Sequence, residues 1–178
     1  MPFTARLIRA ARLEPALFEE VEADRSATVQ SLLVVALASV AGSIWLPVGM
    51  ILPGLVTSII AWFIWALLTY VVGATLLSEP TTEANLGQLL RVIGFASAPG
   101  ILRFAGIGIL AYPIAILTGV WMLVAMVVGI RQALDYRSTA RAVLVAAVGW
   151  VIYLAIILGL LYIGAGSDAT ARPGAAAV

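Results

Sequence analysis

The fold is decided by residues 26–78, which read SATVQSLLVVALASVAGSIWLPVGMILPGLVTSIIAWFIWALLTYVVGATLLS and contain no charged side chain. As one helix these 53 residues would extend about 80 Å, whereas the hydrocarbon core of a bilayer is about 30 Å thick. The stretch must therefore fold back on itself. Because proline cannot continue a helix and glycine permits a reversal, Pro47 and the pair Pro53-Gly54 mark the predicted turn. The first two predicted membrane spans cover residues 29–46 and 55–77.

The composition is that of a membrane protein. Of the 178 residues, 63% are hydrophobic and 11% are charged, whereas soluble domains carry about 25% charged residues. Too few polar groups are present to cover a water-facing surface, so we expect an integral membrane protein. Cysteine and histidine are both absent, which excludes disulfides, thiol chemistry, Cys/His zinc sites and histidine-ligated haem. All ten basic residues are arginine, which with abundant alanine, valine and glycine suggests a GC-rich prokaryotic genome.

The third apolar segment is interrupted. Arg91 and Arg103 are separated by eleven uncharged residues, which rise only about 17 Å in a helix and cannot cross a bilayer. A helix over residues 86–109 would be long enough, with Pro99-Gly100 kinking or breaking it where neighbouring helices satisfy the freed carbonyls. A re-entrant hairpin that turns at this pair is the alternative. Two further apolar runs complete a predicted all-α, five-span helical bundle, at residues 114–130 and 142–164.

The distribution of arginine predicts the orientation, because loops rich in basic residues stay in the cytoplasm. Eight arginines fall on one side of the five-span arrangement: Arg6, Arg9, Arg12, Arg25, Arg91, Arg131, Arg137 and Arg141. Only Arg103 and Arg172 fall on the other side. We therefore expect a cytoplasmic N-terminus and an outside C-terminus in a prokaryotic plasma membrane. A hairpin third segment would move the last three of the eight arginines outside, which favours five spans.

The two ends of the chain differ from its apolar middle. Residues 1–27 alternate arginines with apolar residues and then place Leu17, Phe18 and Val21 at helical spacing among glutamates, with Pro15 between the two halves. This pattern is typical of a short amphipathic helix on the inner membrane surface, and a solvated cytoplasmic lead-in is an equal alternative. Residues 166–178 are small, polar and contain Pro and Gly, which predicts a disordered tail.

Few residues within the spans suggest chemistry. The carboxylates fall in loops or flanks, whereas a proton- or cation-coupled transporter usually has an ionisable group near mid-membrane. Residue sets for an intramembrane protease or a metal site are missing too, so no catalytic residue, cofactor or metal is predicted. Arg91 and Arg103 could form an anion site or a polar vestibule, although snorkelling to the headgroups also explains them. Small residues four apart, such as Gly94/Ala98, predict close helix packing within one chain or in a dimer.

Four motifs occur in order along the chain. Residues 13–35 contain a Pro-x-x-Phe lead-in to the first span, and LLRVIGFASAPGIL (residues 89–102) carries Gly94, Phe95, Ala96 and Pro99 in a Gly-aromatic-Ala-x-x-Pro pattern. Residues 119–134 contain Trp121 in a Trp-x-Leu span, and Arg141-Ala142 opens the last span. Over residues 13–165 this order resembles the Yip family of multispanning membrane proteins, in its prokaryotic branch.

The resemblance implies a five-span helical bundle with a cytoplasmic N-terminus. Eukaryotic members bind small GTPases and each other in vesicle traffic and membrane shaping. This chain departs from them because fewer than thirty residues precede the first span, too few for a substantial partner-binding domain. We therefore do not carry over the GTPase role or any functional residue of the family.

The sequence thus predicts a non-enzymatic, membrane-organising or partner-binding scaffold of the Yip type. The alternative is a small permease or channel component with a polar path at the broken third span. The expected partners are the lipid bilayer and other membrane proteins or a second copy, with no nucleic acid and no identified small molecule. The candidate structural or interaction positions are Arg91, Gly94, Pro99, Gly100, Arg103, Trp121, Arg131 and Arg141.

Overall fold

A computed structural model describes residues 1–44, 46–80 and 82–170, and these residues form helices and connections without a strand. The predicted all-α class is confirmed. The α-helices are α1 (Phe3–Ala11), α2 (Pro15–Ala23), α3 (Ala27–Ser43), α4 (Ile51–Thr69), α5 (Leu86–Ala96), α6 (Ala111–Ala133) and α7 (Thr139–Thr170). Shorter 3₁₀ segments are η1 (Val48–Met50), η3 (Ala98–Ala105) and η4 (Gly108–Leu110), and η2 (Tyr70–Leu76) is π-helical. The predicted disordered tail begins at residue 166, but α7 continues through Thr170, and residues 171–178 lie outside the described residues.

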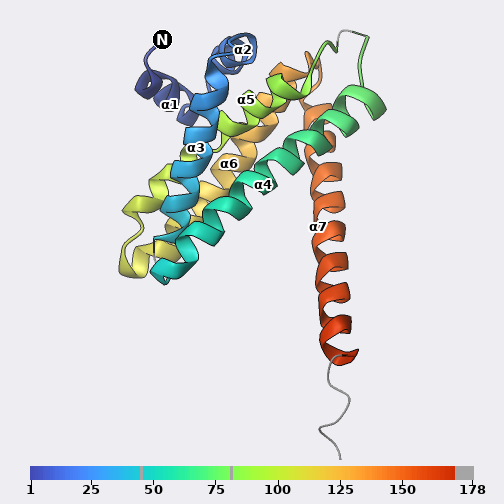
Figure 1. Cartoon of the computed structure of the whole chain (residues 1–178). Helices are drawn as coiled ribbons and strands as arrows, with labels where there is room; N and C mark the ends of the chain where they lie inside the picture. Colours follow the sequence, from blue (N-terminus) through green and yellow to red (C-terminus); the bar gives the residue numbers. More distant parts are fainter. Residues whose placement is uncertain (45, 81, 171–178) are drawn as a thin grey trace, which may run out of the picture.

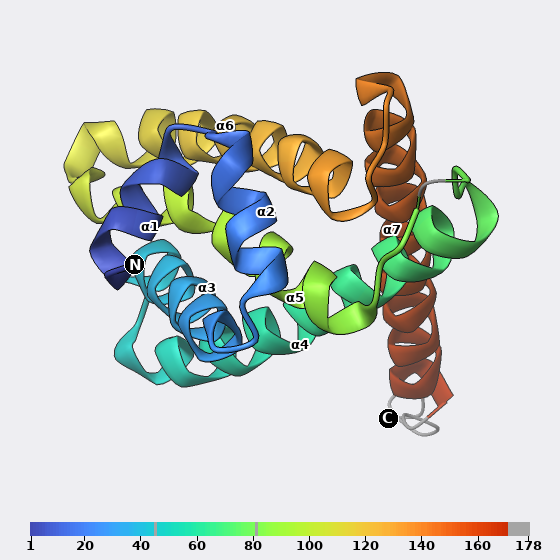
Figure 2. The same cartoon turned by 90° about the horizontal axis from the view of Figure 1, so that it is seen from above.

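The helices form a bundle with α1 and α2 across one end (Figures 1 and 2). In Figure 1, α3 leads away from that end, and α4 returns on an incline. The segment α5–η3 leads away again, α6 returns, and the long α7 leads away at the side of the bundle. The end that carries α1, α2 and the connections after η2 and α6 is called the polar end below.

The first turn differs from its prediction. Pro47 lies in the connection between α3 and η1, as expected, but Pro53 and Gly54 lie inside the first turn of α4. Proline is tolerated there because the first amides of a helix have no intrahelical partner to lose. Gly54 instead allows α3 and α4 to approach, since a Cβ built on it would be 3.0 Å from the Ser43 Oγ.

The third apolar segment is not one kinked helix over residues 86–109. The α-helix α5 has 11 residues and ends at Ala96, and the chain continues from Ala98 as the 3₁₀ segment η3. The start of α5 is well defined, because Asn85 and Gln88 form a capping box. Its end has a local cause as well, since Pro99 disfavours α-helical geometry in the residue before it and cannot donate a helical hydrogen bond.

Within the part of the chain that the structure describes, three helical stretches are long and apolar enough to cross a membrane, namely Val48–Leu76, Gly108–Ala133 and Thr139–Ile156. The apolar helix α3 has 17 residues and is shorter. The structure therefore confirms a helical, membrane-type protein, whereas the predicted count of five spans is not confirmed by helix length and composition.

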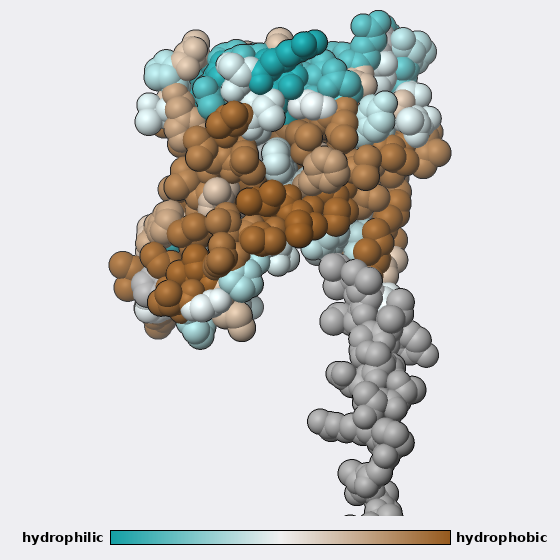
Figure 3. All heavy atoms as spheres, in the orientation of Figure 1, coloured by the Kyte–Doolittle hydropathy of each residue, from teal (hydrophilic) through white to brown (hydrophobic). Residues whose placement is uncertain are grey.

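The surface of the bundle is divided into a polar end and an apolar body (Figure 3). On α4 a stripe of apolar side chains at helical spacing faces outward with exposed fractions of 40–68%: Leu52, Val56, Ile60, Phe63 and Leu67. An apolar surface of this extent is typical of contact with lipid rather than with water.

Close helix packing at glycine holds the centre of the bundle together. A Cβ built on Gly94 of α5 would be 2.6 Å from the Cβ of Ser31 on α3. A Cβ on Gly129 of α6 would be 2.7 Å from Val92 Cγ1 on α5. Both glycines therefore serve packing within one chain, which is one of the two alternatives left open by the small-residue pattern.

Candidate functional site

The polar end begins with a helical hairpin formed by α1 and α2. Leu13 has a φ of 60° in the turn between them, and Pro15 is the first residue of α2. Arg6 of α1 is 3% exposed and donates to Glu20 Oε1 at 2.9 Å and to Asp24 Oδ2 at 2.7 Å. Arg6 also donates to Gln30 Oε1 of α3 at 3.0 Å. One buried guanidinium therefore joins α1, α2 and α3.

Arg9 adds a second set of ion pairs to the hairpin. It donates from Nε to Glu14 Oε2 at 3.0 Å and from Nη1 to Glu20 Oε2. At the end of α2, hydrogen bonds from Ser26 and from Arg6 lower the pKa of Asp24 to about 2. The Asp24 carboxylate is thus held in the charged form by donors on the same end of the bundle.

The hairpin is seated on the bundle by apolar and polar contacts. Leu17, Phe18 and Val21 of α2 are fully buried. Arg91 of α5 donates from Nε to the carbonyl oxygen of Val21 at 2.9 Å and from Nη2 to the carbonyl oxygen of Glu22. The apolar face of α2 therefore packs on protein, and Arg91 binds the end of α2 rather than snorkelling to headgroups.

The connection between α6 and α7 completes the polar end. Tyr136 is buried and donates its hydroxyl towards the carbonyl oxygens of Gly73 at 2.7 Å and Leu77 at 2.9 Å. Arg141 forms an ion pair with Glu79 at 3.2 Å. The predicted position Arg131 is exposed and makes one long hydrogen bond, 3.4 Å, to the carbonyl oxygen of Tyr136. These contacts fasten the start of α7 to the end of η2.

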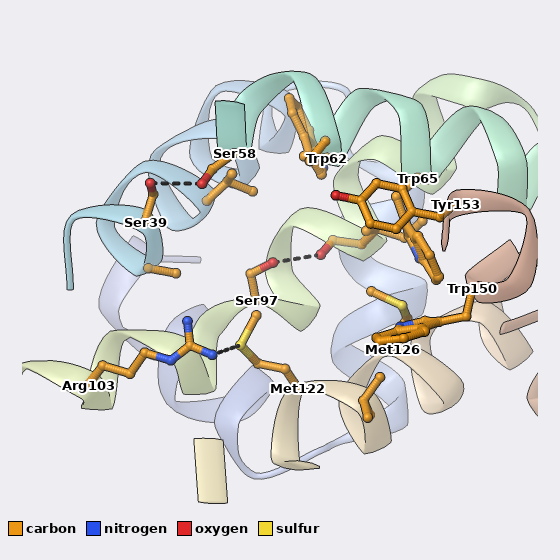
Figure 4. Close-up of a pocket in the computed structure, with 15 residues that line it drawn as sticks. Ser39, Ser58, Trp62, Trp65, Ser97, Arg103, Met122, Met126, Trp150 and Tyr153 are labelled. Atoms are coloured by element: carbon orange, nitrogen blue, oxygen red, sulfur yellow. Dashed lines mark hydrogen bonds between the residues drawn. The ribbon is translucent and has the colours of Figure 1, made fainter. Parts of the chain in front are cut away.

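A cavity of about 290 Å³ lies within the apolar body, between α3, α4, α5, α6 and α7 (Figure 4). Its apolar and aromatic lining residues are Val35, Ala38, Ala61, Trp62, Trp65, Ile93, Met122, Leu123, Met126, Trp150 and Tyr153. Its polar lining residues are Ser39, Ser58, Ser97 and Arg103. The Ser39 and Ser58 hydroxyls are 2.9 Å apart, and the Ser97 hydroxyl donates to the Ile93 carbonyl oxygen. The cavity thus combines an aromatic wall with one cation.

Arg103 of η3 is the only charged residue between positions 92 and 130, and its side chain is partly buried. Its Nε donates to Thr118 Oγ1 of α6 at 3.1 Å, and its Nη2 lies 3.8 Å from the sulfur of Met122. No carboxylate among the described residues pairs with it. The predicted break at Pro99-Gly100 is buried at the start of η3, the segment that carries Arg103.

The candidate positions do not form one site. Arg103 lines the cavity, whereas Arg91 does not line it and is bonded to α2. Trp121 is partly exposed on α6 and does not line the cavity either. A polar path that uses both arginines therefore has no support in the structure. Among the described residues there is also no group of three His, Cys, Asp or Glu side chains that could hold a metal ion.

Several residues that matter in the structure were missed by sequence reasoning. The ion pairs of Arg6 with Glu20 and Asp24 join residues 14 and 18 positions apart, and no spacing rule predicts them. The cavity residues Ser39 and Ser58 were missed too, although paired hydroxyls on two apolar helices are a recognised signal of interhelical hydrogen bonding.

Comparison with known proteins gives one match. A family profile described as "Yip1 domain" matches residues 14–161, which is most of the chain. The matched residues run from the start of α2 into α7. Searches of curated proteins and of solved structures find no match.

Proposed function

Because the chain belongs to the Yip1 domain family, we propose that it is a non-enzymatic scaffold that holds partner proteins at a membrane. Its docking face is the polar end: the outer faces of α1 and α2, the connection after η2 and the connection after α6. The observation that carries this proposal is the seating of the α1–α2 hairpin. A short amphipathic segment could lie on the lipid surface without contacting the bundle. Here Arg6 and Arg91 bind the hairpin to the bundle, so that its outer faces form a fixed surface.

We infer five membrane crossings, with the polar end in the cytoplasm and the C-terminus outside. The directions of α3, α4, α5–η3, α6 and α7 in Figure 1 support this count. The charge distribution supports the orientation, since the arginines at positions 6–25 and those of residues 131–141 share one end of the bundle. The chain contains no cysteine, so a single introduced cysteine reports its side of the membrane without background.

The topology is tested with Ser138→Cys at the polar end and Ile109→Cys at the opposite end, where Ile109 is 92% exposed. In intact cells a membrane-impermeant maleimide should label Ile109→Cys and should label Ser138→Cys only after lysis. Labelling of both residues in intact cells, or of neither without lysis, contradicts the five-span orientation.

The scaffold role is tested by photo-cross-linking from the outer face of α1. Ile8 is 53% exposed there, and Ile109 at the far end of the bundle is the matched exposed control. A cross-linker at Ile8 should yield one reproducible protein adduct that the control position does not yield. The adduct should disappear in Arg6→Gln, which releases the hairpin. Adducts that are the same from both positions contradict a docking face at the polar end.

A further inference from the structure

We propose that the cavity around Arg103 binds an anionic amphiphile: a carboxylate or phosphate head group carried on an apolar chain. The head group pairs with the guanidinium, and the chain leaves the cavity between α6 and α7. This inference does not depend on partner binding at the polar end.

The charge of Arg103 is the first reason to propose an anionic ligand. An arginine inside an apolar bundle is costly unless it is paired or hydrated. The other arginines with low exposure have partners: Arg6 pairs with two carboxylates, and Arg91 donates to two carbonyl oxygens. Arg103 has only a neutral hydroxyl and a thioether among the described residues. A site of this kind is complementary to an anion, because guanidinium binds carboxylate and phosphate with several parallel hydrogen bonds.

The position of the guanidinium is the second reason, because it places the charge inside the cavity. Figure 4 shows Arg103 at one side of the cavity, with its Nη2 directed to Met122 and across from Ser97. The Thr118 hydroxyl holds Nε and in turn donates to the carbonyl oxygens of Ile114 and Ala115. The contact with α6 therefore orients the Arg103 side chain towards the cavity rather than towards the outer surface.

The shape of the surrounding space defines the rest of the ligand. A second hollow, of about 360 Å³, lies between α6 and α7 and is lined by Leu123, Val127, Val143, Ala146, Ala147 and Trp150. Leu123 and Trp150 line both spaces, and both are 46% exposed. The cavity around Arg103 thus continues into an apolar groove that reaches the lipid-facing surface. A small inorganic anion would leave this groove and the aromatic wall unused, whereas an acyl chain fits both.

Tryptophan fluorescence provides the test, because Trp62, Trp65 and Trp150 line the cavity. The protein is reconstituted in phosphatidylcholine nanodiscs that contain brominated phosphatidic acid or brominated fatty acid, with brominated phosphatidylcholine as the neutral reference. We expect stronger quenching by both anionic probes at equal mole fraction. Arg103→Gln should weaken their apparent affinity by roughly tenfold, or about 1.4 kcal/mol. Arg103→Lys, which keeps the charge but not the parallel hydrogen bonds of the guanidinium, should bind more tightly than Arg103→Gln and less tightly than the wild type. Arg131→Gln at the polar end should bind as the wild type does.

Two further arms locate the ligand and name its source. Trp150→Phe should reduce the quenched amplitude, whereas Trp121→Phe, outside the cavity, should not. This arm remains informative if Arg103→Gln fails to fold. Excess inorganic phosphate should not displace the brominated probes; displacement by phosphate alone would identify a small-anion site and overturn the amphiphile. Equal quenching by anionic and neutral probes, or quenching that Arg103→Gln leaves unchanged, overturns the proposal as well.

Discussion

Arg91 of α5 donates from Nε to the carbonyl oxygen of Val21 at 2.9 Å, although the two residues are 70 positions apart in the chain. The carbonyls of Val21 and Glu22 lie in the last turn of α2, where no amide further along the helix is available to satisfy them. The negative end of the helix dipole lies there too and favours a cation. Arg91 thus serves as a side-chain cap for a helix that is distant in the sequence but packs against α5.

We expect Arg91→Gln to release the α1–α2 hairpin. Hydrogen bonds to charged groups contribute about 1.5–3 kcal/mol, and glutamine cannot reach both carbonyls with a guanidinium's geometry. Limited proteolysis should therefore cleave the connection between α2 and α3, residues 24–26, several times faster than in the wild type. Arg131→Gln is the control, because Arg131 is exposed and makes a single long hydrogen bond. Equal cleavage rates for the wild type and Arg91→Gln would show that the apolar face of α2 alone seats the hairpin.

Gly94→Ala should destabilise the packing of α5 on α3. The new Cβ would be 2.6 Å from Ser31 Cβ and 3.0 Å from the Ser31 backbone oxygen, so a helix must shift. Overpacking of this kind costs about 1–3 kcal/mol. Gly119→Ala on α6 is the matched control, since nothing lies within 4 Å of its Cβ position. Thermal unfolding in detergent should show a lower midpoint for Gly94→Ala and an unchanged or higher one for Gly119→Ala.

The sequence predicted those features of the fold that depend on local chemistry. Apolar runs between charged segments became helices, and Pro99 ended α5 at Ala96 as the proline rules imply. The error at Pro53-Gly54 has a local cause too. From the sequence, Pro53 is interpreted as the end of a helix, whereas in the structure it lies in the first turn of α4. A proline that ends a helix and one that begins a helix differ only in whether the residues before it are helical.

The features that the sequence did not predict depend on contacts between distant segments. The sequence places Arg91 near a span end, where snorkelling to the headgroups is sufficient to explain it, whereas in the structure α2 ends beside it. The orientation of Arg103 also depends on a contact that the sequence does not predict, because Thr118 on another helix sets it. Periodicity identifies which residues share a face of one helix, but it does not identify the helix that this face meets.

Tyr136→Phe should loosen the junction between η2 and α7. The π-helical turns of η2 end with carbonyl oxygens at Gly73 and Leu77 that accept from the Tyr136 hydroxyl. Phenylalanine keeps the ring but leaves these buried acceptors without that donor, at a cost of about 1–3 kcal/mol. Amide hydrogen exchange should rise at residues 74–79. Tyr112→Phe provides the comparison, because Tyr112 is 75% exposed. Unchanged exchange in Tyr136→Phe would assign the stability of this junction to the Arg141–Glu79 ion pair instead.

The pH dependence of stability should depend on Glu22. Burial, together with the nearby charge of Asp135, raises the pKa of Glu22 to about 7, against the opposing effect of Arg91. In the unfolded chain this carboxyl has its ordinary pKa near 4.5. Between these two values the folded state binds more protons than the unfolded state, so the free energy of unfolding falls as the pH rises from about 5 to 7.

The lowered pKa of Asp24 acts in the opposite direction, but only at more acidic pH, because its stabilising charge is lost as the pH falls towards 2. Unfolding midpoints measured between pH 5 and pH 8 therefore isolate Glu22. The wild type should lose stability across this window, and Glu22→Gln should flatten the profile because glutamine has no proton to lose. Glu83→Gln, at an exposed position of the same polar end, should keep the slope of the wild type. Parallel profiles for the wild type and Glu22→Gln would place the pH-sensitive group elsewhere at the polar end.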